Sequence, residues 1–226
     1  MAGNLQLVAT ADGSYTILNE AVGEHYHSRN GALQESMHVF VNAGLAYFLA
    51  EHQTTEVSVL EVGFGTGLNF LLSANACMQR GVKLNYTGIE AFPLSAELIA
   101  QTGYDQYVPA ALWKQFTAGY EQLIKTENKP LQIEGCALTI ATCPLLGFNP
   151  DEQFDIIYFD AFAASKQPEM WNEEAINHTI KFLKPGGVFV TYAITGNLKR
   201  MLKSLGVTIQ KIPGAAGKRE MLRGCR

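Results

Sequence analysis

The 226-residue sequence predicts an α/β fold: a doubly wound, mostly parallel sheet of seven strands, with an antiparallel C-terminal hairpin and a small N-terminal hairpin extension. Apolar, strand-like runs alternate with helix-periodic segments, which is typical of a parallel sheet with helical crossovers. A glycine-rich turn also separates the first of these runs from the next helix. No linker divides the chain, so we expect an extension over residues 1–55 packed on one domain over residues 56–226.

The N-terminal segments predict a hairpin and a helix. LQLVATADGSYTIL alternates apolar and polar residues around Asp12 and Gly13, a pair that favours a tight turn. The polar, turn-rich segment GEHYHSRNGALQES follows. Apolar side chains then recur at helical spacing, which predicts a helix over residues 37–51.

The central segments predict the first part of the main sheet. Residues 57–62 and 84–90 have the composition of buried strands, and residues 68–80 have that of the helix between them. Another helix is expected from about Ser95. LQIEGCALTIATC then predicts two short strands about Gly135.

The C-terminal segments predict the rest of the sheet. Residues 154–159 form the next expected strand, and a helix over residues 168–183 follows it. KPGG predicts a turn, VFVTYA a strand and NLKRMLKSLG an amphipathic helix. VTIQKIP and REMLRG, separated by GAAGK, predict a closing antiparallel pair. Right-handed crossovers between these elements give a Rossmann-like topology.

Composition favours a folded, soluble, cytoplasmic protein. The chain is 47% apolar and 17% charged, enough for a sizeable core. No apolar run approaches the ~20 residues of a membrane span, and the N-terminus resembles no secretory signal. The four cysteines form no CxxC pair, and His25 and His27 have no second pair of ligands, so we expect no metal site.

Positive charge gathers at the C-terminal end. The net charge is −4, yet eight of the 17 Lys and Arg residues lie in the last 30 positions. Two interpretations remain open: a basic face suited to phosphates, or a solvated helix and edge strand.

The glycine-rich turn EVGFGTGLNF predicts a ligand site. In doubly wound sheets ligands bind beyond the carboxyl ends of the strands, and Gly63, Gly65 and Gly67 permit close approach of the backbone there. Glu61 would repel a pyrophosphate but favours a cation, such as the sulfonium and ammonium of S-adenosylmethionine (SAM). Glu90, at the end of the next strand, suits the ribose hydroxyls of SAM or NAD.

Several motifs together carry a family resemblance. They are YHSRNGALQESMHVF, EVGFGTGLNFLL, GIEAFPLS, DAFAASKQPEMW, LKPGGVFVTY and GKREMLRG. Over nearly its whole length the chain resembles the SAM-dependent methyltransferase domain of the MnmC type, which finishes 5-methylaminomethyl-2-thiouridine at the tRNA wobble position. The resemblance implies SAM as cofactor, tRNA as partner and an upstream enzyme that supplies the aminomethyl group. The chain resembles the stand-alone form of this domain, which lacks the flavin-dependent oxidase, so we expect no FAD.

The resemblance also implies a substrate site around Asp160. A carboxylate at this strand end accepts an N–H hydrogen bond from the acceptor amine and stabilises the ammonium that forms. Phe162 and Trp171 are expected to wall the pocket or stack on a flipped base, and Lys166 to contact phosphate. The alternatives are a turn cap for Asp160, core packing for Trp171 and a solvated Lys166.

The implied cofactor site draws on several segments. Tyr26, Ser28 and Glu35 precede the core, and we expect the first and last of them in the cofactor pocket. Thr142 and Cys143 stand where such enzymes usually have an acid for the adenine. Two alternatives follow: a main-chain carbonyl replaces the acid, or SAM binding is weakened. The remaining expected cofactor residues are Phe64 and Asn69 from the glycine turn and Ala91 after Glu90.

The loop before the last strand is expected to approach the tRNA backbone through Lys218 and Arg219, beside Glu220. Two other functions stay open on the sequence. One is a methyltransferase or aminopropyltransferase-like enzyme for a small amine, which would not need RNA. The other is a non-catalytic module that binds SAM or tRNA, suggested by the missing acid near Thr142.

Overall fold

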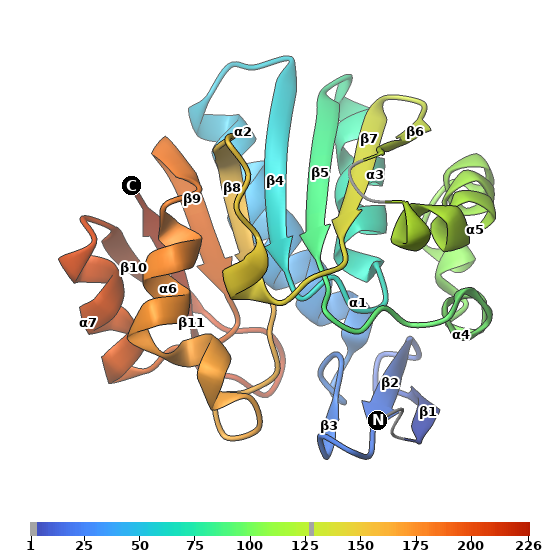
Figure 1. Ribbon diagram of the computed structural model, residues 1–226, viewed down its shortest axis with the longest axis horizontal. Helices are drawn as coiled ribbons and strands as arrows, with labels where there is room; N and C mark the ends of the chain where they lie inside the picture. The colour runs from blue at the N-terminus through green and yellow to red at the C-terminus, as the bar shows by residue number, and fades with distance from the viewer. Residues whose placement is uncertain (1–3, 127–128) are drawn as a thin grey trace.

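The computed structural model describes residues 4–126 and 129–226, which form two sheets and their covering helices (Figure 1). The strands of the main sheet are β4 (Glu56–Val62), β5 (Lys83–Ile89), β6 (Leu131–Ile133), β7 (Cys136–Ala141), β8 (Phe154–Phe159), β9 (Leu183–Thr191), β10 (Thr208–Pro213) and β11 (Glu220–Cys225). Their order across the sheet is β10-β11-β9-β8-β4-β5-β7-β6.

The predicted doubly wound, mostly parallel fold is confirmed. Five central strands, β7, β5, β4, β8 and β9, run parallel, and β11 and β10 close one edge as an antiparallel pair. The sheet has one strand more than the seven expected, because β6 folds back antiparallel onto β7. Gly135 supplies the turn between them with φ +75°, a conformation that favours glycine.

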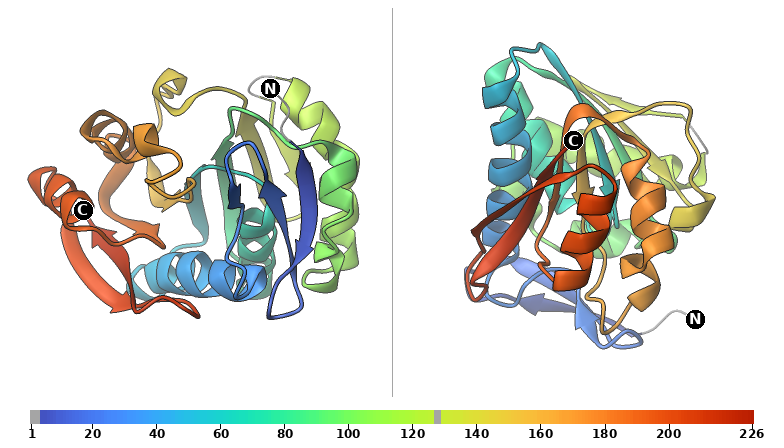
Figure 2. Two further views of the ribbon diagram at one scale, coloured as in Figure 1. Left: turned by 90° about the horizontal axis from the view of Figure 1, so that it is seen from below. Right: turned by 90° about the vertical axis from the view of Figure 1, so that its left-hand side faces the viewer.

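Helices cover both faces of the main sheet. They are α1 (Ala32–Glu35), the π-helical η1 (Ser36–Ala46), α2 (Tyr47–Glu51), α3 (Leu68–Arg80), α4 (Ala96–Ala100), α5 (Ala110–Lys125), α6 (Glu173–Ile180) and α7 (Gly196–Ser204). Short 3₁₀ turns lie at Tyr104–Gln106, Leu145–Gly147 and Pro168–Trp171. Figure 2 shows η1 and α2 on the face opposite α6 and α7.

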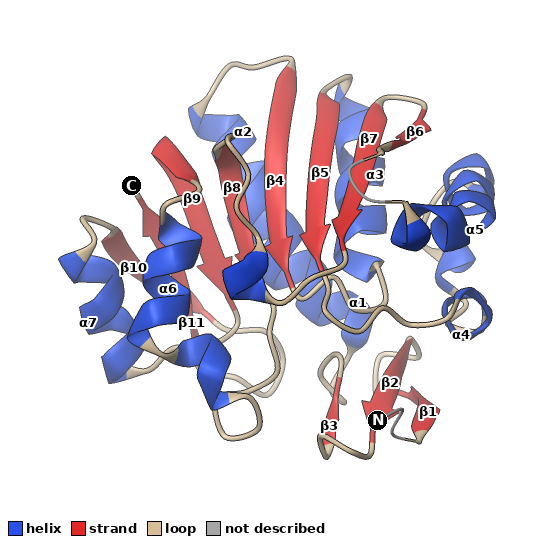
Figure 3. Ribbon diagram, viewed as in Figure 1, coloured by secondary structure: helices blue, strands red, loops and turns tan. Residues whose placement is uncertain are grey.

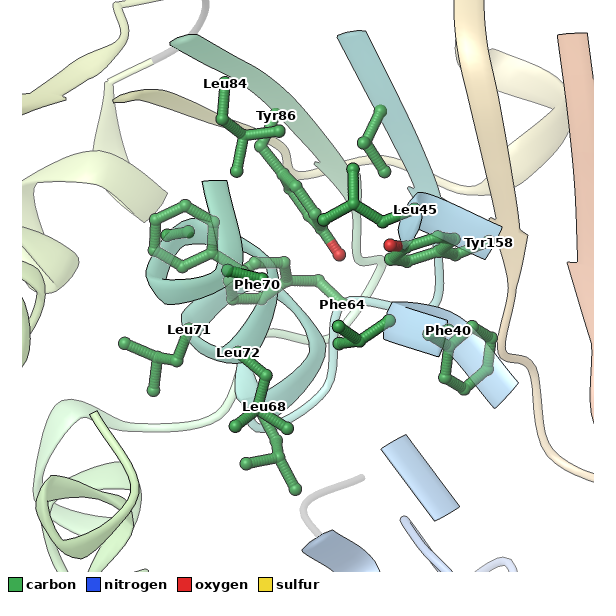
Figure 4. Packing of buried hydrophobic residues seen from close by; sticks show 14 of the residues in the cluster. Phe40, Leu45, Phe64, Leu68, Phe70, Leu71, Leu72, Leu84, Tyr86 and Tyr158 are labelled. Carbon is green, nitrogen blue, oxygen red and sulfur yellow. The ribbon is translucent and has the colours of Figure 1, made fainter. Parts of the chain in front are cut away.

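Each face has its own apolar core. One cluster joins η1, α3 and α5 to the sheet, and Figure 4 shows part of it, with Phe40, Phe70, Tyr86 and Tyr158 packed together. The second cluster lies under α6 and α7 and includes Phe159 and Phe189. Because both faces are covered, the central strands are mostly apolar, as parallel strands usually are.

Two predicted helices differ in extent. The helix expected from Ser95 is two helices, α4 and α5, because Gly103 turns the chain with φ +68° and Pro109 precedes α5. The helix expected over residues 168–183 is shorter: a 3₁₀ turn is followed by α6, which starts at Glu173 with the Asn172 side chain as its cap. Both differences come from local chain-turning residues inside otherwise helical patterns.

The N-terminal residues form a separate three-stranded antiparallel sheet. Its strands are β1 (Leu5–Ala9), β2 (Tyr15–Asn19) and β3 (Glu24–His25), and β1 and β2 form the predicted hairpin, with Ala9 paired with Tyr15. Figure 3 shows this small sheet beyond the carboxyl ends of β4, β5 and β7. The Tyr104 hydroxyl donates a hydrogen bond to the Tyr15 carbonyl at 3.0 Å. The extension therefore lies at the edge of the main sheet where ligands of such folds bind.

Among the residues described, none of the helices has the length and apolar character needed to cross a membrane.

Candidate active site

The strand order places a topological switch point between β4 and β8. From β4 the chain moves to β5 and β7 on one side, then returns to β8 on the other. The carboxyl ends of β4 and β8 are joined there, since the Asp160 amide donates to the Val62 carbonyl at 2.9 Å. The glycine turn and Asp160 thus meet where doubly wound sheets bind their ligands.

Gly63 fits this position because it has no side chain. Its φ is +86°, and a Cβ there would overlap the carbonyl oxygen of Asp160. Its amide and that of Phe64 both donate to the Ile89 carbonyl, at 3.0 and 3.1 Å. The turn is therefore held between the ends of three parallel strands.

Gly65 and Gly67 complete the turn. Gly67, with φ +78°, caps the start of α3. A Cβ at Gly65 would lie 2.9 Å from the Tyr26 ring, so Tyr26 packs directly on the turn. The ring of Phe64 points the other way, into the core against Gly88 and Phe116, which leaves only its backbone for a ligand.

Glu90 braces the same turn from the end of β5. Its two carboxylate oxygens accept the amides of Gly65 and Phe92, each at 3.0 Å. Burial raises the pKa of Glu90, and the two amides oppose that rise. Each carboxylate oxygen keeps a further lone pair, so the predicted ribose contact stays a prediction. Ala91 follows it, half-buried.

Glu61 lies beneath the turn rather than in the ligand site. Its side chain is fully buried, with 0% exposure. One carboxylate oxygen accepts Asn69 Nδ2 at 2.7 Å, and the other accepts the Tyr86 hydroxyl at 2.8 Å. Burial, and then the Asp160 carboxylate, raise the pKa of Glu61 well above its usual range. The direct contact that the sequence suggested between Glu61 and a cation is not supported by this position.

Asp160 faces a cavity of about 210 Å³. The cavity is lined by Glu24, His25, Tyr26, His27, Ser28, Arg29, Glu35, Asp160, Ala161, Phe162, Tyr192 and Lys218. Asn69 Nδ2 donates to Asp160 Oδ2 at 2.8 Å. Burial, followed by the nearby Glu35 carboxylate, raises the pKa of Asp160 to about 8, against the opposing effects of Asn69 and Lys218. Strongly shifted carboxylates in a cavity are candidates for chemistry.

Glu35 and Lys218 form an ion pair in this cavity. Lys218 Nζ lies 2.7 Å from Glu35 Oε1, and the Ser28 amide donates to Glu35 Oε2 at 2.8 Å. The ammonium also lies over the Tyr192 ring, 3.8 Å from its centroid, a cation–π contact. The expected phosphate contact of Lys218 stays a prediction, and in this structure the ammonium is paired with Glu35 instead. Arg219 and Lys166, in contrast, are exposed.

The aromatic residues of the loop after β8 divide between cavity and core. Phe162 lines the cavity and meets the Tyr26 ring edge-on, with centroids 5.0 Å apart. Trp171 is only 8% exposed and packs on Phe159 and Tyr192. Its Nε1 donates to the Phe162 carbonyl at 2.7 Å. Trp171 thus supports the loop from the core, and the expected base contact is not supported.

Near the end of β7 the sequence departs from the usual acid. Cys143 is half-buried, and Thr142 is exposed. The Ala141 carbonyl accepts the amides of Glu90 and Cys143, at 3.1 and 3.0 Å. The main-chain contact to adenine that we expected here stays a prediction.

Sequence reasoning missed several cavity residues, and Tyr192 and His27 are among them. Tyr192 follows β9 as Asp160 follows β8, so the rule that strand ends gather would have found it. The buried His27 is a different case. Its Nδ1 has no hydrogen-bond partner among the described residues, and burial lowers its pKa to about 4. Its burial depends on the packing of the extension, which no local pattern shows.

The site suits a cationic nucleoside. The carboxylates of Glu35 and Asp160 line the cavity, and that of Glu90 lies on the adjoining glycine turn. Within residues 4–126 and 129–226, the buried Asn69 Oδ1 has no hydrogen-bond partner. Within the described residues, no group of three or more His, Cys, Asp or Glu side chains is placed to hold a metal ion. A glycine turn, a carboxylate after β5 and an acidic cavity at the switch point define an α/β enzyme that handles a positively charged nucleoside.

Comparison with known proteins gives the family. The chain belongs to the S-adenosyl-L-methionine-dependent methyltransferases, whose family model matches residues 109–226. SAM is accordingly the cofactor of this enzyme, and the residues at the site fit it.

Two curated relatives are similar over most of the chain. Both are tRNA 5-methylaminomethyl-2-thiouridine biosynthesis bifunctional proteins MnmC. The one from Ectopseudomonas mendocina is 31% identical over 92% of this chain, and the one from Methylobacillus flagellatus is 32% identical over 89%. The chain spans about a third of their length, 33% and 32%.

Solved structures share the fold. MNMC2 from Aquifex aeolicus matches with a TM-score of 0.77 and 21% identity, covering 98% of this chain and 70% of its own. A putative class I SAM-dependent methyltransferase from Listeria monocytogenes matches with a TM-score of 0.50 and 17% identity, covering 80% of this chain and 58% of its own.

Proposed function

We propose that the enzyme is an N-methyltransferase that uses SAM to methylate the aminomethyl group of 5-aminomethyl-2-thiouridine at the wobble position of tRNA. The similarity to the MnmC proteins, named for the biosynthesis of that nucleoside, supports the substrate. The observation that carries the proposal is Asp160, a carboxylate with a raised pKa at the cavity wall between Glu35 and the aromatic Phe162 and Tyr192.

The acceptor nitrogen must be neutral to react. SAM supplies an electrophilic methyl group on its sulfonium. The amine lone pair forms the new N–C bond while the S–C bond breaks and its electron pair stays on sulfur. The ionised Asp160 accepts an N–H hydrogen bond from the amine, orients its lone pair and takes the proton that the product ammonium releases. A carboxylate with a pKa of about 8 is a stronger base than an ordinary aspartate, which suits this task.

The cavity walls suit a nucleobase. Tyr26, Phe162 and Tyr192 present aromatic surface around Asp160. A base that leaves its stack can lie against such rings, which replace the stacking lost on flipping. Tyr26 contacts both the glycine turn and Phe162. It therefore links the expected cofactor side of the cavity to the acceptor side.

The tRNA backbone would meet exposed cations of two loops and of α7. Arg219 stands beside Lys218 in the hairpin loop, Lys166 lies in the loop after β8, and Arg200 and Lys203 are exposed on α7. Charges of this kind make binding sensitive to salt. The substrate further requires a cytoplasmic location and an upstream enzyme that installs the aminomethyl group before this one acts.

A methyl-transfer assay tests the proposal. Bulk tRNA lacking the terminal methyl group is compared with free polyamines as acceptors of labelled methyl from SAM. We expect transfer to tRNA only, at the wobble uridine, and loss of transfer in Asp160→Asn with SAM binding retained. Transfer to polyamines alone would identify a small-amine enzyme, and SAM binding without transfer to either would identify a binding module. Each of these outcomes would overturn the proposal.

A further inference from the structure

A chain of buried hydrogen bonds runs from the core to the cavity. The Tyr86 hydroxyl donates to Glu61 at 2.8 Å, and Asn69 Nδ2 donates to Glu61 at 2.7 Å and to Asp160 at 2.8 Å. Figure 4 shows Tyr86 within the packed cluster between β5 and α3. These residues come from β5, β4, α3 and the end of β8, so the chain crosses the sheet at its switch point.

We propose that Asn69 is a positioning residue that holds the Asp160 carboxylate for methyl transfer, and that Glu61 anchors Asn69 instead of contacting SAM. The inference rests on the proposed function for the role of Asp160. It gives Asn69 and Glu61 a different role from the one that the glycine-turn pattern predicts, which is contact with the cofactor.

The geometry of Asn69 supports this role. The side chain is 2% exposed, so its amide cannot exchange its partners for water. An amide nitrogen has two hydrogens, and here one is used by each carboxylate. The hydrogen bond to Glu61 fixes the orientation of the Asn69 amide. The amide in turn fixes the position of Asp160 Oδ2. The first turn of α3 supplies a rigid support.

The burial and protonation of Glu61 explain why its side chain does not offer a negative charge to the cofactor. It has no exposed surface and does not line the cavity. The groups that act on it electrostatically are the acidic Asp160 and Glu90, with hydrogen bonds only from the neutral Asn69 and Tyr86. Burial and these neighbouring acids favour the protonated, neutral form of Glu61. A neutral acid still accepts the Asn69 amide but does not attract a cation as a carboxylate would.

Asp160 responds to groups from several elements. Glu35 on α1 raises its pKa, while Asn69 on α3 and Lys218 before β11 lower it. The Asp160 carboxylate in turn raises the pKa of Glu61. Burial, followed by Asp160, Glu24 and Glu35, raises the pKa of the Tyr192 hydroxyl after β9. Of these groups, Asn69 alone donates a hydrogen bond from a position fixed by a second carboxylate, so its loss has a predictable direction: the pKa of Asp160 rises further.

The first experiment separates the two roles of Glu61. Glu61→Gln removes the possibility of a charge at this position and keeps an oxygen for Asn69. Calorimetry is expected to give a Kd for SAM close to the wild-type value. A weakening of about tenfold or more would show that the Glu61 charge meets SAM, and would overturn the proposal.

The second experiment tests Asn69. In Asn69→Leu we expect a higher pKa of Asp160 than the wild-type value of about 8, followed by NMR of labelled aspartate carboxyl carbons. Methyl transfer to tRNA should fall in kcat with the Kd for SAM retained. The matched control is Asn75→Leu on the same helix, since Asn75 bonds only Gln79 among the residues described. An unchanged Asp160 pKa in Asn69→Leu would overturn the proposal.

A second variant tests whether the effect of Asn69→Leu comes from misfolding. Asn69→Ser keeps a small polar group on α3 that is too short to reach both carboxylates, and the same rise in the Asp160 pKa is expected. Neither the calorimetry nor the NMR titration uses tRNA. A wild-type enzyme inactive on tRNA would therefore refute the proposed function alone, whereas an unmoved Asp160 pKa would refute the role of Asn69 alone.

Discussion

Asp160 is placed where its charge opposes folding. An unfolded aspartate has a pKa of about 3.9, whereas burial and Glu35 raise the folded value to about 8. The folded state therefore binds the proton more tightly, so its stability is highest below the unfolded pKa. It declines as the pH rises from about 4 to about 8. The Asp160 carboxylate is therefore held in place by the rest of the fold.

Replacing this charge should stabilise the enzyme without ligand. Asp160→Asn keeps an oxygen that accepts Asn69 Nδ2 and removes the buried charge. We expect a higher Tm than wild type above about pH 8, and a difference that disappears below about pH 4. Thermal melts across this range check it. Equal Tm values at high pH would mean that Asp160 is well solvated.

Lys218 belongs to the cavity, and its replacement should behave accordingly. Lys218→Met leaves the buried Glu35 with only the Ser28 amide, which should lower stability by roughly 1–3 kcal/mol. The slope of log K for tRNA against log salt should stay unchanged, since a lost phosphate contact would reduce it by about 1. Filter binding over a salt series measures the slope. Arg219→Met, at the exposed neighbour, is the control expected to reduce it.

Among the elements, the glycine turn provides the sharpest test of packing. Gly63→Ala adds a methyl group that overlaps the Asp160 carbonyl, in a conformation with φ +86°. We expect lower stability and weaker SAM binding, because the end of β8 must move. Gly81→Ala is the matched control: its φ is +66°, and a Cβ there meets nothing within 4 Å. It should lose only about 1–2 kcal/mol of backbone strain and bind SAM normally. Calorimetry and thermal melts of both variants decide the question.

Elements with a complete local signal were predicted well. Helix α3 is bounded by Gly67 and Gly81, and strand β8 is an apolar run that ends at a charged residue, so both were found with their observed limits. The break between α4 and α5 was missed, because Gly103 and Pro109 lie in a segment whose apolar spacing is helical on both sides.

The site was predicted in part. The glycine turn and Asp160 follow from the rule that ligands bind at strand ends. The burial of Glu61 could not be predicted, since it depends on Asn69 and Tyr86, which lie on other elements. The Lys218–Glu35 pair joins residues 183 positions apart, so no local pattern reveals it.

The molecule as a whole has a second aspartate network at the opposite end of β8. Asp155 accepts the Ser58 amide and hydroxyl at 2.8 and 2.7 Å and pairs with Lys184 at 2.9 Å. Burial opposes its ionisation, but the Ser58 and Lys184 contacts outweigh it and lower the pKa of Asp155. This contribution to stability is present above the unfolded pKa and is lost as the pH falls through the folded pKa.

Asp155→Asn should therefore change the folding stability in the opposite direction to Asp160→Asn. We expect a loss of about 1–2 kcal/mol near neutral pH, with a difference from wild type that shrinks below about pH 4. Denaturant titrations at several pH values measure it. SAM binding should be unaffected, because the network lies near the starts of β4 and β8. A loss that persists unchanged in acid would contradict the assigned sign.

The ion pair of Glu35 and Lys218 is accompanied by two other contacts between the same segments. Asn30 Nδ2 donates to the Ala216 carbonyl at 3.1 Å, and His38 Nε2 lies 2.8 Å from the Pro213 carbonyl. The wall of the cavity is thus completed by residues that are synthesised about 180 positions after the segment they contact. We expect a nascent chain halted between the two segments to lack this wall, so the cavity would form only after the ribosome has passed Lys218.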